Sequence, residues 1–366
     1  MSLLCCFYKI NNIFWNNIVF RIIKNLCSWN AVVFWGFSKI DFVSNYEVTS
    51  IFIGGGTPTT LNVSQTQRIF DTLKGTFQIS QDAEITIEAN PGTVTQEKLE
   101  IYRTCGINRI SFGLQSTNNE ELKLLGRVHT YEEFLESYQL ARECGFDNIN
   151  VDLISAIPKQ TLVSWEETLQ NVIKLNPEHI SAYSLIVEDG TPFAKVYGEG
   201  CPGEKDLPNE KEERKIYYRT DELLKAAGYH RYEISNYAKE GKECKHNLGY
   251  WERKEYLGIG LGSASLIDNT RYKNTDDLTC YMKHAGKLNA IQEDIQVLSQ
   301  KEQMEEFMFL GLRKVEGISE TEFKDCFDIE VDKYYGDQLD KLEREELLEI
   351  LRSYYGTAAL KMNVFD

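Results

Sequence analysis

The sequence predicts an α/β protein, a partial (β/α)6 barrel followed by a smaller, mainly helical C-terminal domain. Runs rich in Ile, Val and Phe, bounded by turn residues, alternate with amphipathic helical patterns from residue 48 onward. The strand centres are roughly 25 to 40 residues apart, which leaves room for a helix between strands and is typical of parallel βα units. Beyond about residue 240 this repeat stops, and helical patterns dominate.

The six predicted strands begin with "VTSIFIGG" and end with "HRYEISNYA". Six units are too few for a closed eightfold barrel, so an open or partial barrel is expected, with function on the loops that follow the strands. The predicted strands are 48–55, 84–91, 107–114, 148–158, 179–187 and 230–238.

Capping signals support the helices between these strands. Thr130 and Glu133 form a predicted capping box, and Gly106 and Gly145 stand where helix C-caps are expected. The predicted domains are an atypical segment 1–46, a barrel core 47–240 and a C-terminal domain 241–366. The predicted helices are 63–77, one starting at Thr95, 130–145, 161–177, 209–227, 299–315 and 318–350.

Charge and cysteine usage narrow the class of protein. The net charge of −16 argues against nucleic acid as the main partner, because phosphate binding needs a basic face. None of the nine cysteines lies two to four residues from another, so no local metal-binding loop is expected. Most are read as small buried hydrophobic residues, and free thiols with no secretion signal indicate a cytoplasmic protein.

Residues 1–46 differ in composition from the rest of the chain. They hold eleven aromatic residues, seven asparagines and no proline. Lys9, Arg21 and Lys24 interrupt the apolar runs, so no membrane span is expected, and a membrane anchor is the less favoured alternative. The segment has no clear helix or strand period and is expected to be a poorly ordered extension.

The first strand runs directly into three glycines at 54–56. Glycine has no Cβ, so a ligand can lie against the backbone N–H and C=O groups of such a loop. A glycine at a strand end is equally common as a simple turn, and both interpretations stay open for this motif alone.

Polar residues follow the next strands at the same expected rim. Glu88 ends its strand, Gln115 lies just past the next, Arg127 precedes a helix, and Asp152 lies within the fourth strand. Each alone is consistent with a structural salt bridge or cap. Together with the glycine loop they favour a ligand that carries amine, carboxylate and hydroxyl groups.

Several segments in order resemble radical S-adenosylmethionine (SAM) proteins of the HemW type, the heme chaperone family that is also described as oxygen-independent coproporphyrinogen III oxidase-like. The resemblance covers roughly residues 46–350. Its motifs are "IFIGGGTPTTL", "IEANPGTVTQEKL", "INRISFGLQSTNNEELKLLGRVHT", "NVDLISAIPKQT", "HISAYSLIVEDGTP", "RYEISNYAKEGKECKHNLGYWERKEYLGIG" and "EFMFLGLRKVEGI".

The resemblance implies a SAM site at the rim. In the family the glycine loop holds the methionine part of SAM through its backbone. By chemistry, carboxylates suit the ribose hydroxyls or the ammonium group of SAM, and an arginine suits its carboxylate. The residues carried over as SAM contacts are Gly55, Gly56, Thr57, Glu88, Gln115, Arg127 and Asp152.

The resemblance also implies heme as a ligand and an unidentified heme-acceptor protein as a partner. "HNLGYW" matches a segment associated with heme, which makes His246 the candidate axial ligand; a structural hydrogen-bonding role is the alternative. A "GAHS"-like family stretch reads Gly262-Ser263-Ala264-Ser265 here and lacks the histidine.

The chain departs from the family at its cluster motif. Radical SAM proteins bind a [4Fe-4S] cluster through three cysteines spaced C-x3-C-x2-C, and the cluster delivers the electron that cleaves SAM to a carbon radical. Cys5, Cys6 and Cys27 do not have this spacing. We therefore expect no cluster here, and we interpret residues 1–46, with "LRSYYGTAALKMNVFD" at 351–366, as products of a shifted or mis-started reading frame.

Four functions stay open on the sequence. The first is a HemW-like heme chaperone, with radical chemistry doubtful without the cluster motif. The second is an oxygen-independent coproporphyrinogen III oxidase (dehydrogenase) of porphyrin biosynthesis. The third is a degenerate, non-catalytic scaffold, and the fourth is a barrel enzyme that uses the glycine loop for phosphate.

Overall fold

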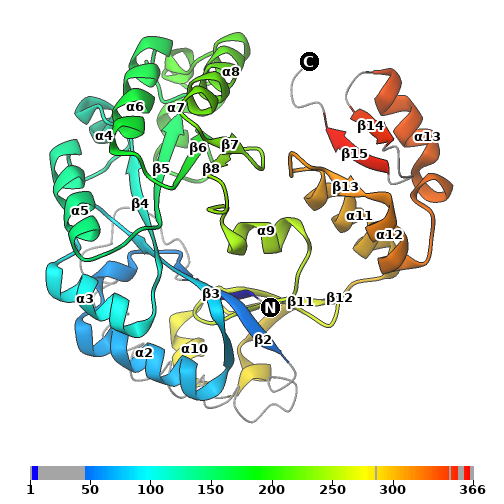
Figure 1. Ribbon diagram of the computed structural model, residues 1–366, viewed down its shortest axis with the longest axis horizontal. Helices are drawn as coiled ribbons and strands as arrows, with labels where there is room; N and C mark the ends of the chain where they lie inside the picture. Colours follow the sequence, from blue (N-terminus) through cyan, green and yellow to red (C-terminus); the bar gives the residue numbers. More distant parts are fainter. Residues whose placement is uncertain (1, 7–45, 285–286, 346–347, 353–357, 363–366) are drawn as a thin grey trace.

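The computed structural model describes residues 2–6, 46–284, 287–345, 348–352 and 358–362. A curled sheet forms the core, and a separate C-terminal part lies beside its open side (Figure 1). This arrangement confirms the predicted α/β class, with a partial barrel and a smaller C-terminal part that is mostly helical. Among these residues, no helix is both long and apolar enough to cross a membrane.

The large sheet is parallel at its centre and antiparallel at both ends. Strands β1 to β6 pair in parallel in sequence order, and β9 also pairs in parallel with β1. The full order is β12-β11-β10-β9-β1-β2-β3-β4-β5-β6-β8-β7. The strands are β1 (Ser2–Cys6), β2 (Glu47–Gly54), β3 (Gln78–Ala89), β4 (Arg109–Gln115), β5 (Ile149–Ser155), β6 (His179–Ser184), β7 (His230–Arg231), β8 (Asn236–Ala238), β9 (Tyr256–Gly258), β10 (Ala264–Ile267), β11 (Thr270–Asn274) and β12 (Gln292–Val297).

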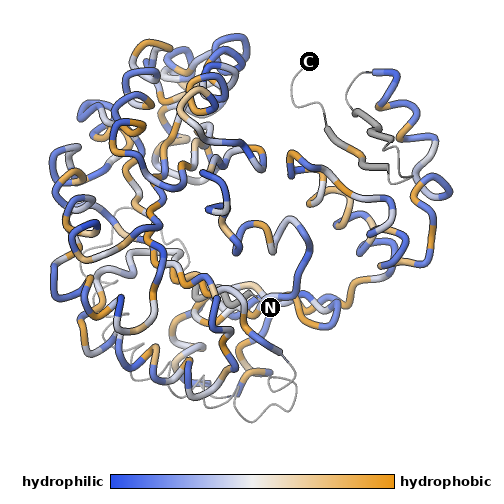
Figure 2. The backbone as a smooth tube through the Cα atoms, viewed as in Figure 1, coloured by the Kyte–Doolittle hydropathy of each residue, from blue (hydrophilic) through white to orange (hydrophobic). Residues whose placement is uncertain are grey.

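Helices cover the outer face of the parallel strands (Figure 1). Their apolar sides and alternate strand residues form one core, which includes Ile87, Phe112, Val151 and Trp165. Figure 2 shows hydrophobic stretches along the central strands and hydrophilic stretches on the outer helices. The helices are α2 (Val63–Thr76), α3 (Gln96–Cys105), α4 (Asn119–Leu124), α5 (Tyr131–Glu143), α6 (Leu162–Leu175), α7 (Ala194–Tyr197), α8 (Glu210–Ala226), α9 (Lys245–Trp251) and α10 (Leu278–Lys283).

Most local signals in the barrel are confirmed. The capping box of Thr130 and Glu133 forms, Gly106 caps α3 in the left-handed region, and Gly145 has a φ of 84°. The prediction of one further parallel strand at 230–238 is wrong. This segment forms two short strands, β7 and β8, which pair with each other and with β6 in antiparallel fashion.

The expectation of an unstructured N-terminal extension is wrong for its first residues. The backbone of Ser2–Cys6 forms β1, which pairs in parallel with both β2 and β9 and so belongs to the parallel part of the large sheet. Residues 7–45, including Cys27 and most of the aromatic segment, lie outside the described residues.

The C-terminal part has its own hydrophobic core, which includes Met304, Phe323, Leu339 and Leu360. Ala358–Met362 forms the middle strand of its small sheet, so part of the segment 351–366 is integrated into this core. The predicted domain division stays a prediction, and β9 to β12 continue the large sheet past residue 240. The elements are α11 (Gln300–Gly311), β13 (Ile318–Ser319), α12 (Glu320–Phe327), α13 (Val331–Arg344), β14 (Leu348–Arg352) and β15 (Ala358–Met362).

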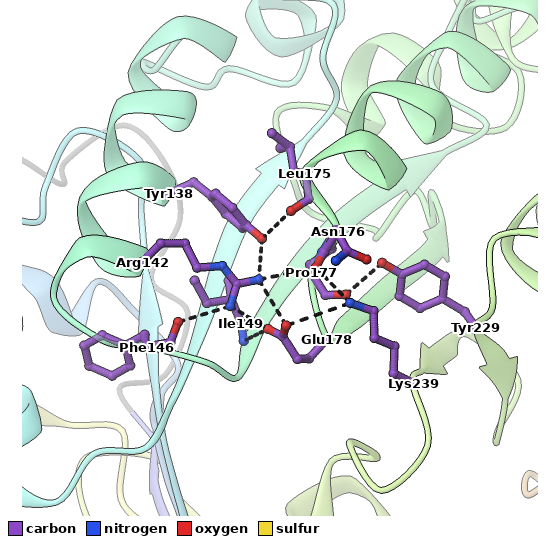
Figure 3. A network of polar contacts seen from close by, with 10 residues as sticks. All are labelled: Tyr138, Arg142, Phe146, Ile149, Leu175, Asn176, Pro177, Glu178, Tyr229 and Lys239. Atoms are coloured by element: carbon purple, nitrogen blue, oxygen red, sulfur yellow. Dashed lines mark hydrogen bonds and ion pairs between the residues drawn. The ribbon is translucent and has the colours of Figure 1, made fainter.

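A polar network fixes the start of β5 to its neighbours (Figure 3). Glu178, just before β6, accepts two hydrogen bonds from Arg142 of α5, at 2.8 and 3.2 Å, and a third from the backbone N–H of Ile149 at 3.0 Å. Tyr138 donates to the Leu175 carbonyl at the end of α6. The network sets the spacing of β5 and β6, and both strands carry residues that line the barrel.

Replacing Glu178 with alanine should lower the free energy of unfolding by about 2–3 kcal/mol, because Arg142 and the Ile149 N–H lose a largely buried acceptor. Urea denaturation at pH 7 measures this change. Glu120, whose ion pair with Lys123 is exposed, provides the control. Glu120→Ala should cost less than about 0.5 kcal/mol. Equal effects of the two substitutions would contradict the role of this network.

Candidate functional site

The glycine loop at the end of β2 is held by a carboxylate from the next strand. Gly55 has a φ of 80°, and its N–H donates to Glu88 Oε2 at 2.9 Å. A Cβ at Gly54 would lie 2.6 Å from Glu88 Cδ, so only glycine leaves room for this carboxylate. The bare backbone of the loop therefore serves first to receive the Glu88 side chain.

The loop continues into a short 3-10 helix, η2 (Pro58–Thr60), whose start is fixed by a residue that the sequence analysis did not select. Asn90 Nδ2, just past β3, donates to Thr57 Oγ1 at 3.1 Å. Lys98 of α3 donates to the Thr59 carbonyl at 2.6 Å. The quoted motif "EAN" contains Asn90, but its contact with Thr57 depends on the pairing of two strands and is invisible in a single segment.

Gln115 ends β4 in an unusual backbone conformation. Its φ of 74° lies in the left-handed region, which a non-glycine residue rarely adopts, and the residue is 7% exposed. Its side chain folds back over Gly113, where an added Cβ would lie 3.0 Å from Gln115 Nε2. Strain of this kind persists where the surroundings hold it and is common at ligand sites.

Asp152 is the most completely bonded of the predicted site residues. Its Oδ2 accepts from Ser111 Oγ of β4 at 2.9 Å, and its Oδ1 accepts from Asn150 Nδ2 of β5 at 2.8 Å. Asn150 Nδ2 also donates to Ser111 Oγ. This triangle answers the prediction that a carboxylate within a barrel strand requires hydrogen-bonding partners.

Electrostatic effects link Asp152 to two other predicted residues. Desolvation raises the pKa of Glu88 to about 7. The nearby charge of Asp152 adds to this rise, and the hydrogen bond from the Gly55 N–H opposes it. Desolvation lowers the pKa of Arg127, while Asp152 acts in the opposite direction. The structure thus brings Gly55, Glu88, Asp152 and Arg127 into one electrostatic site at the ends of the parallel strands.

His246 lies at a different level of the barrel. It belongs to α9, is 3% exposed, and its ring stacks on Phe52 of β2 at 4.8 Å between centroids. Its Nδ1 lies 3.4 Å from Ser50 Oγ, and its backbone N–H donates to Glu84. Desolvation, followed by Arg109, lowers the pKa of His246 to about 3. This ring is a neutral, packed side chain that faces β2, away from solvent.

The cysteines do not match a cluster site. Over the parts of the chain that are described, no group of three or more His, Cys, Asp or Glu side chains is arranged to hold a metal ion. Cys105, Cys144, Cys201, Cys244, Cys280 and Cys326 are free thiols. In the backbone register, Cys6 at the end of β1 pairs with Gly54, but no cysteine follows it at the family spacing.

Comparison with known proteins assigns the class. A profile of the Radical SAM superfamily matches residues 38–172, and one of the HemN C-terminal domain matches residues 298–355. The solved structure of coproporphyrinogen III oxidase (HemN) from Escherichia coli, described as a radical SAM enzyme, has a TM-score of 0.79. The match covers 98% of this chain and 86% of that one at 22% identity, which shows the fold. The profile match, together with this fold, places the chain in the radical SAM class.

Curated relatives identify the family. The heme chaperone HemW of Lactococcus lactis is 37% identical over 85% of this chain and 82% of the relative. HemW of Bacillus subtilis is 37% identical over 82% and 79%, and HemW of Escherichia coli is 41% identical over 63% and 59%. The chain belongs to the HemW family, and radical SAM membership implies SAM and a [4Fe-4S] cluster as the family's cofactors.

Glu88 should titrate with a midpoint near pH 7, since both desolvation and Asp152 disfavour its charged form. Carbon-13 NMR of glutamate-labelled protein, with the signal assigned through Glu88→Gln, measures the midpoint. In Asp152→Asn the midpoint should fall, because a like charge has been removed. In Glu97→Gln, an exposed change on α3, it should not move. An unchanged midpoint in Asp152→Asn would refute the coupling between the two carboxylates.

Proposed function

We propose that this chain binds SAM at the rim formed by the glycine loop, Glu88, Gln115, Arg127 and Asp152, and that it carries heme to an acceptor protein. The observation that carries the SAM proposal is the contact of Glu88 with Gly55 beside the Asp152 carboxylate. Two carboxylates and one guanidinium at this position match a ligand that carries an ammonium group, a sulfonium group and a carboxylate.

The side chains suggest how SAM would lie. Gly55, Gly56 and Thr57 would approach its methionine part through their backbone. Asp152, fixed by Ser111 and Asn150, offers acceptors for a ribose hydroxyl or the ammonium group. Arg127, held beside Asp152, would pair with the SAM carboxylate. Glu88 contributes attraction for a cation only when it is ionised.

The residues present do not fit the [4Fe-4S] cluster. The sequence contains no C-x3-C-x2-C spacing, and no described group of side chains replaces it. We therefore derive no reductive cleavage of SAM for this chain. In this respect it differs from what radical SAM membership implies, and SAM would act here as a bound ligand.

Heme is proposed as the cargo of this chain on the basis of its family. The relatives are heme chaperones by name, and "HNLGYW" lies on α9. An axial ligand must present a ring nitrogen to the iron, whereas His246 is enclosed by Phe52 and β2. Ligation by His246 therefore requires α9 to move away from β2. A structural role for His246 remains the competing proposal.

The coproporphyrinogen III oxidase alternative receives support from the fold alone. The similarity to that structure is 22% in sequence, while the HemW relatives reach 37% over most of both chains. We accordingly keep the chaperone proposal first and propose no porphyrinogen turnover.

SAM binding should depend on Asp152 and on pH. Isothermal titration calorimetry of the full chain should show affinity for SAM that falls about tenfold or more in Asp152→Asn, the effect of losing an acceptor for a charged or hydroxyl group. Affinity of the unsubstituted chain should rise from pH 6 to pH 8, because Glu88 ionises near pH 7 and its carboxylate attracts the cationic ligand.

Glu97→Gln, remote from the rim, is the matched control and should bind SAM like the unsubstituted chain at each pH. Absence of SAM binding in the unsubstituted chain would overturn the proposal. If the SAM affinity of the native chain does not change with pH, Glu88 does not contribute to the site. The role of Asp152 is tested separately by Asp152→Asn.

Hemin titration tests the cargo. The native chain should shift the Soret band on binding hemin, and His246→Ala should lose that shift. The matched control is His284→Ala, which removes the histidine that caps the C-terminus of α10. It leaves the same number of histidines as His246→Ala and should retain the Soret shift. No Soret shift in the native chain contradicts heme binding, and a shift retained in His246→Ala assigns the ligand to another residue.

A further inference from the structure

A continuous line of hydrogen bonds runs through the inside of the barrel from Asp152 to the helix that carries "HNLGYW". Asp152 Oδ1 accepts from Asn150 Nδ2 at 2.8 Å, and Asn150 Oδ1 lies 2.6 Å from His179 Nδ1. His179 Nε2 lies 2.8 Å from the Tyr232 hydroxyl. That hydroxyl accepts from the backbone N–H of Cys244, the N-cap of α9, at 3.3 Å.

Chemistry fixes the direction of each bond. The Asp152 carboxylate can only accept, so the atom of Asn150 that faces it must be the NH2 group. The Asn150 oxygen then faces His179, and His179 Nδ1 must carry the proton that it accepts. The register of the sheet supports this arrangement, since Asn150 and His179 are direct partners across β5 and β6.

The other ring nitrogen follows from the surroundings. His179 is fully buried, and desolvation, followed by Arg109 and His230, lowers its pKa well below the usual value, so the ring is neutral. Neutral imidazole with a proton on Nδ1 must accept at Nε2. Tyr232 therefore donates its hydroxyl proton to His179 and accepts from the Cys244 N–H, which matches the geometry at both atoms.

We propose that His179 is a positioning residue: its Nδ1–H orients Asn150, and through it the Asp152 carboxylate, while its Nε2 holds Tyr232 and thereby the start of α9. The assignment of Asp152 to SAM rests on the proposed function. The orientation of Asp152 and the hold on α9 do not depend on it.

The two halves of the ring have separate consequences. The Nδ1 side determines which way the Asn150 amide turns, and a turned amide would place its oxygen against the Asp152 carboxylate. The Nε2 side determines whether the Tyr232 hydroxyl has a hydrogen-bond partner in addition to the Cys244 N–H at the start of α9. One buried residue therefore contacts both Asn150, which donates to the Asp152 carboxylate, and Tyr232, which accepts from the N-cap residue of the helix that contains His246.

Two substitutions at the same position separate these halves. In His179→Asn the side-chain amide reaches the place of Nδ1 and can donate to Asn150, but it is too short to reach Tyr232. In His179→Gln the amide reaches the place of Nε2 and can accept from Tyr232, but the donor to Asn150 is lost. Tyr232→Phe removes the hydroxyl alone and is the matched control for His179→Asn.

We expect His179→Gln to weaken SAM binding about fivefold in calorimetry, the effect of one hydrogen bond, and to shift the Glu88 titration midpoint that Asp152 influences. His179→Asn and Tyr232→Phe should leave the SAM affinity within about twofold of that of the native chain, and they should leave the Glu88 midpoint unchanged. They should instead speed hydrogen–deuterium exchange of the peptide containing Cys244–Trp251, which His179→Gln should leave unchanged.

The proposal would be overturned if His179→Asn and His179→Gln both fold and both change the SAM affinity, the Glu88 midpoint and the exchange of Cys244–Trp251 in the same way. If the variants do not fold, nitrogen-15 NMR of the native histidine decides: a proton on Nδ1 and none on Nε2 at pH 7 supports the assignment, and a proton on Nε2 overturns it. If the native chain does not bind SAM, the proposed function fails, while the Glu88 midpoint, the exchange data and the tautomer still test His179.

Discussion

The Asp152 carboxylate lies inside the barrel, where an unpaired charge is costly, and much of the surrounding structure serves to satisfy it. Ser111 and Asn150 supply donors from two neighbouring strands. Those donors are in place only because β4, β5 and β6 pair in one register, with Ser111 opposite Asn150 and Asn150 opposite His179. The network around Glu178 holds the start of β5 in that same register. A shift by one residue would turn the polar side chains toward the apolar outer layer.

The sequence contained enough information to predict the parallel strands and helices of the barrel, because each is a local pattern with its own caps and turns. It did not predict β1, since five residues within an atypical segment carry no period that separates them from their surroundings. It also joined β7 and β8 into one strand, because "HRYEISNYA" alternates like a strand. Between them the Ser235 N–H donates to the Glu233 carboxylate, and the Ser235 carbonyl accepts from the Ala182 N–H of β6, a tertiary hydrogen bond that no local pattern reports.

The same limit applies to the candidate site. Glu88 and Asp152 stood out because a carboxylate at or within a buried strand is unusual. Asn90, Ser111 and Asn150 did not, since small polar residues are ordinary in strands and gain a role only from the neighbours that pairing gives them. The resemblance to the family placed His246 at a heme site by its motif, whereas the structure shows what the motif could not: a ring packed on Phe52, with its backbone held by Glu84.

Strands β2 and β3 each contact both the glycine loop or its neighbour Glu88 and helix α9. β3 carries Glu84, which accepts from the start of α9, and Glu88, which accepts from the glycine loop. β2 carries Ser50 and Phe52 against His246 and ends in Gly54 beside Glu88. A ligand that draws Glu88 away from Gly55 would therefore act on the same two strands that enclose His246. Because side chains four residues apart on one strand face the same side, Glu84 at the start of α9 and Glu88 at the glycine loop belong to one row of side chains on β3.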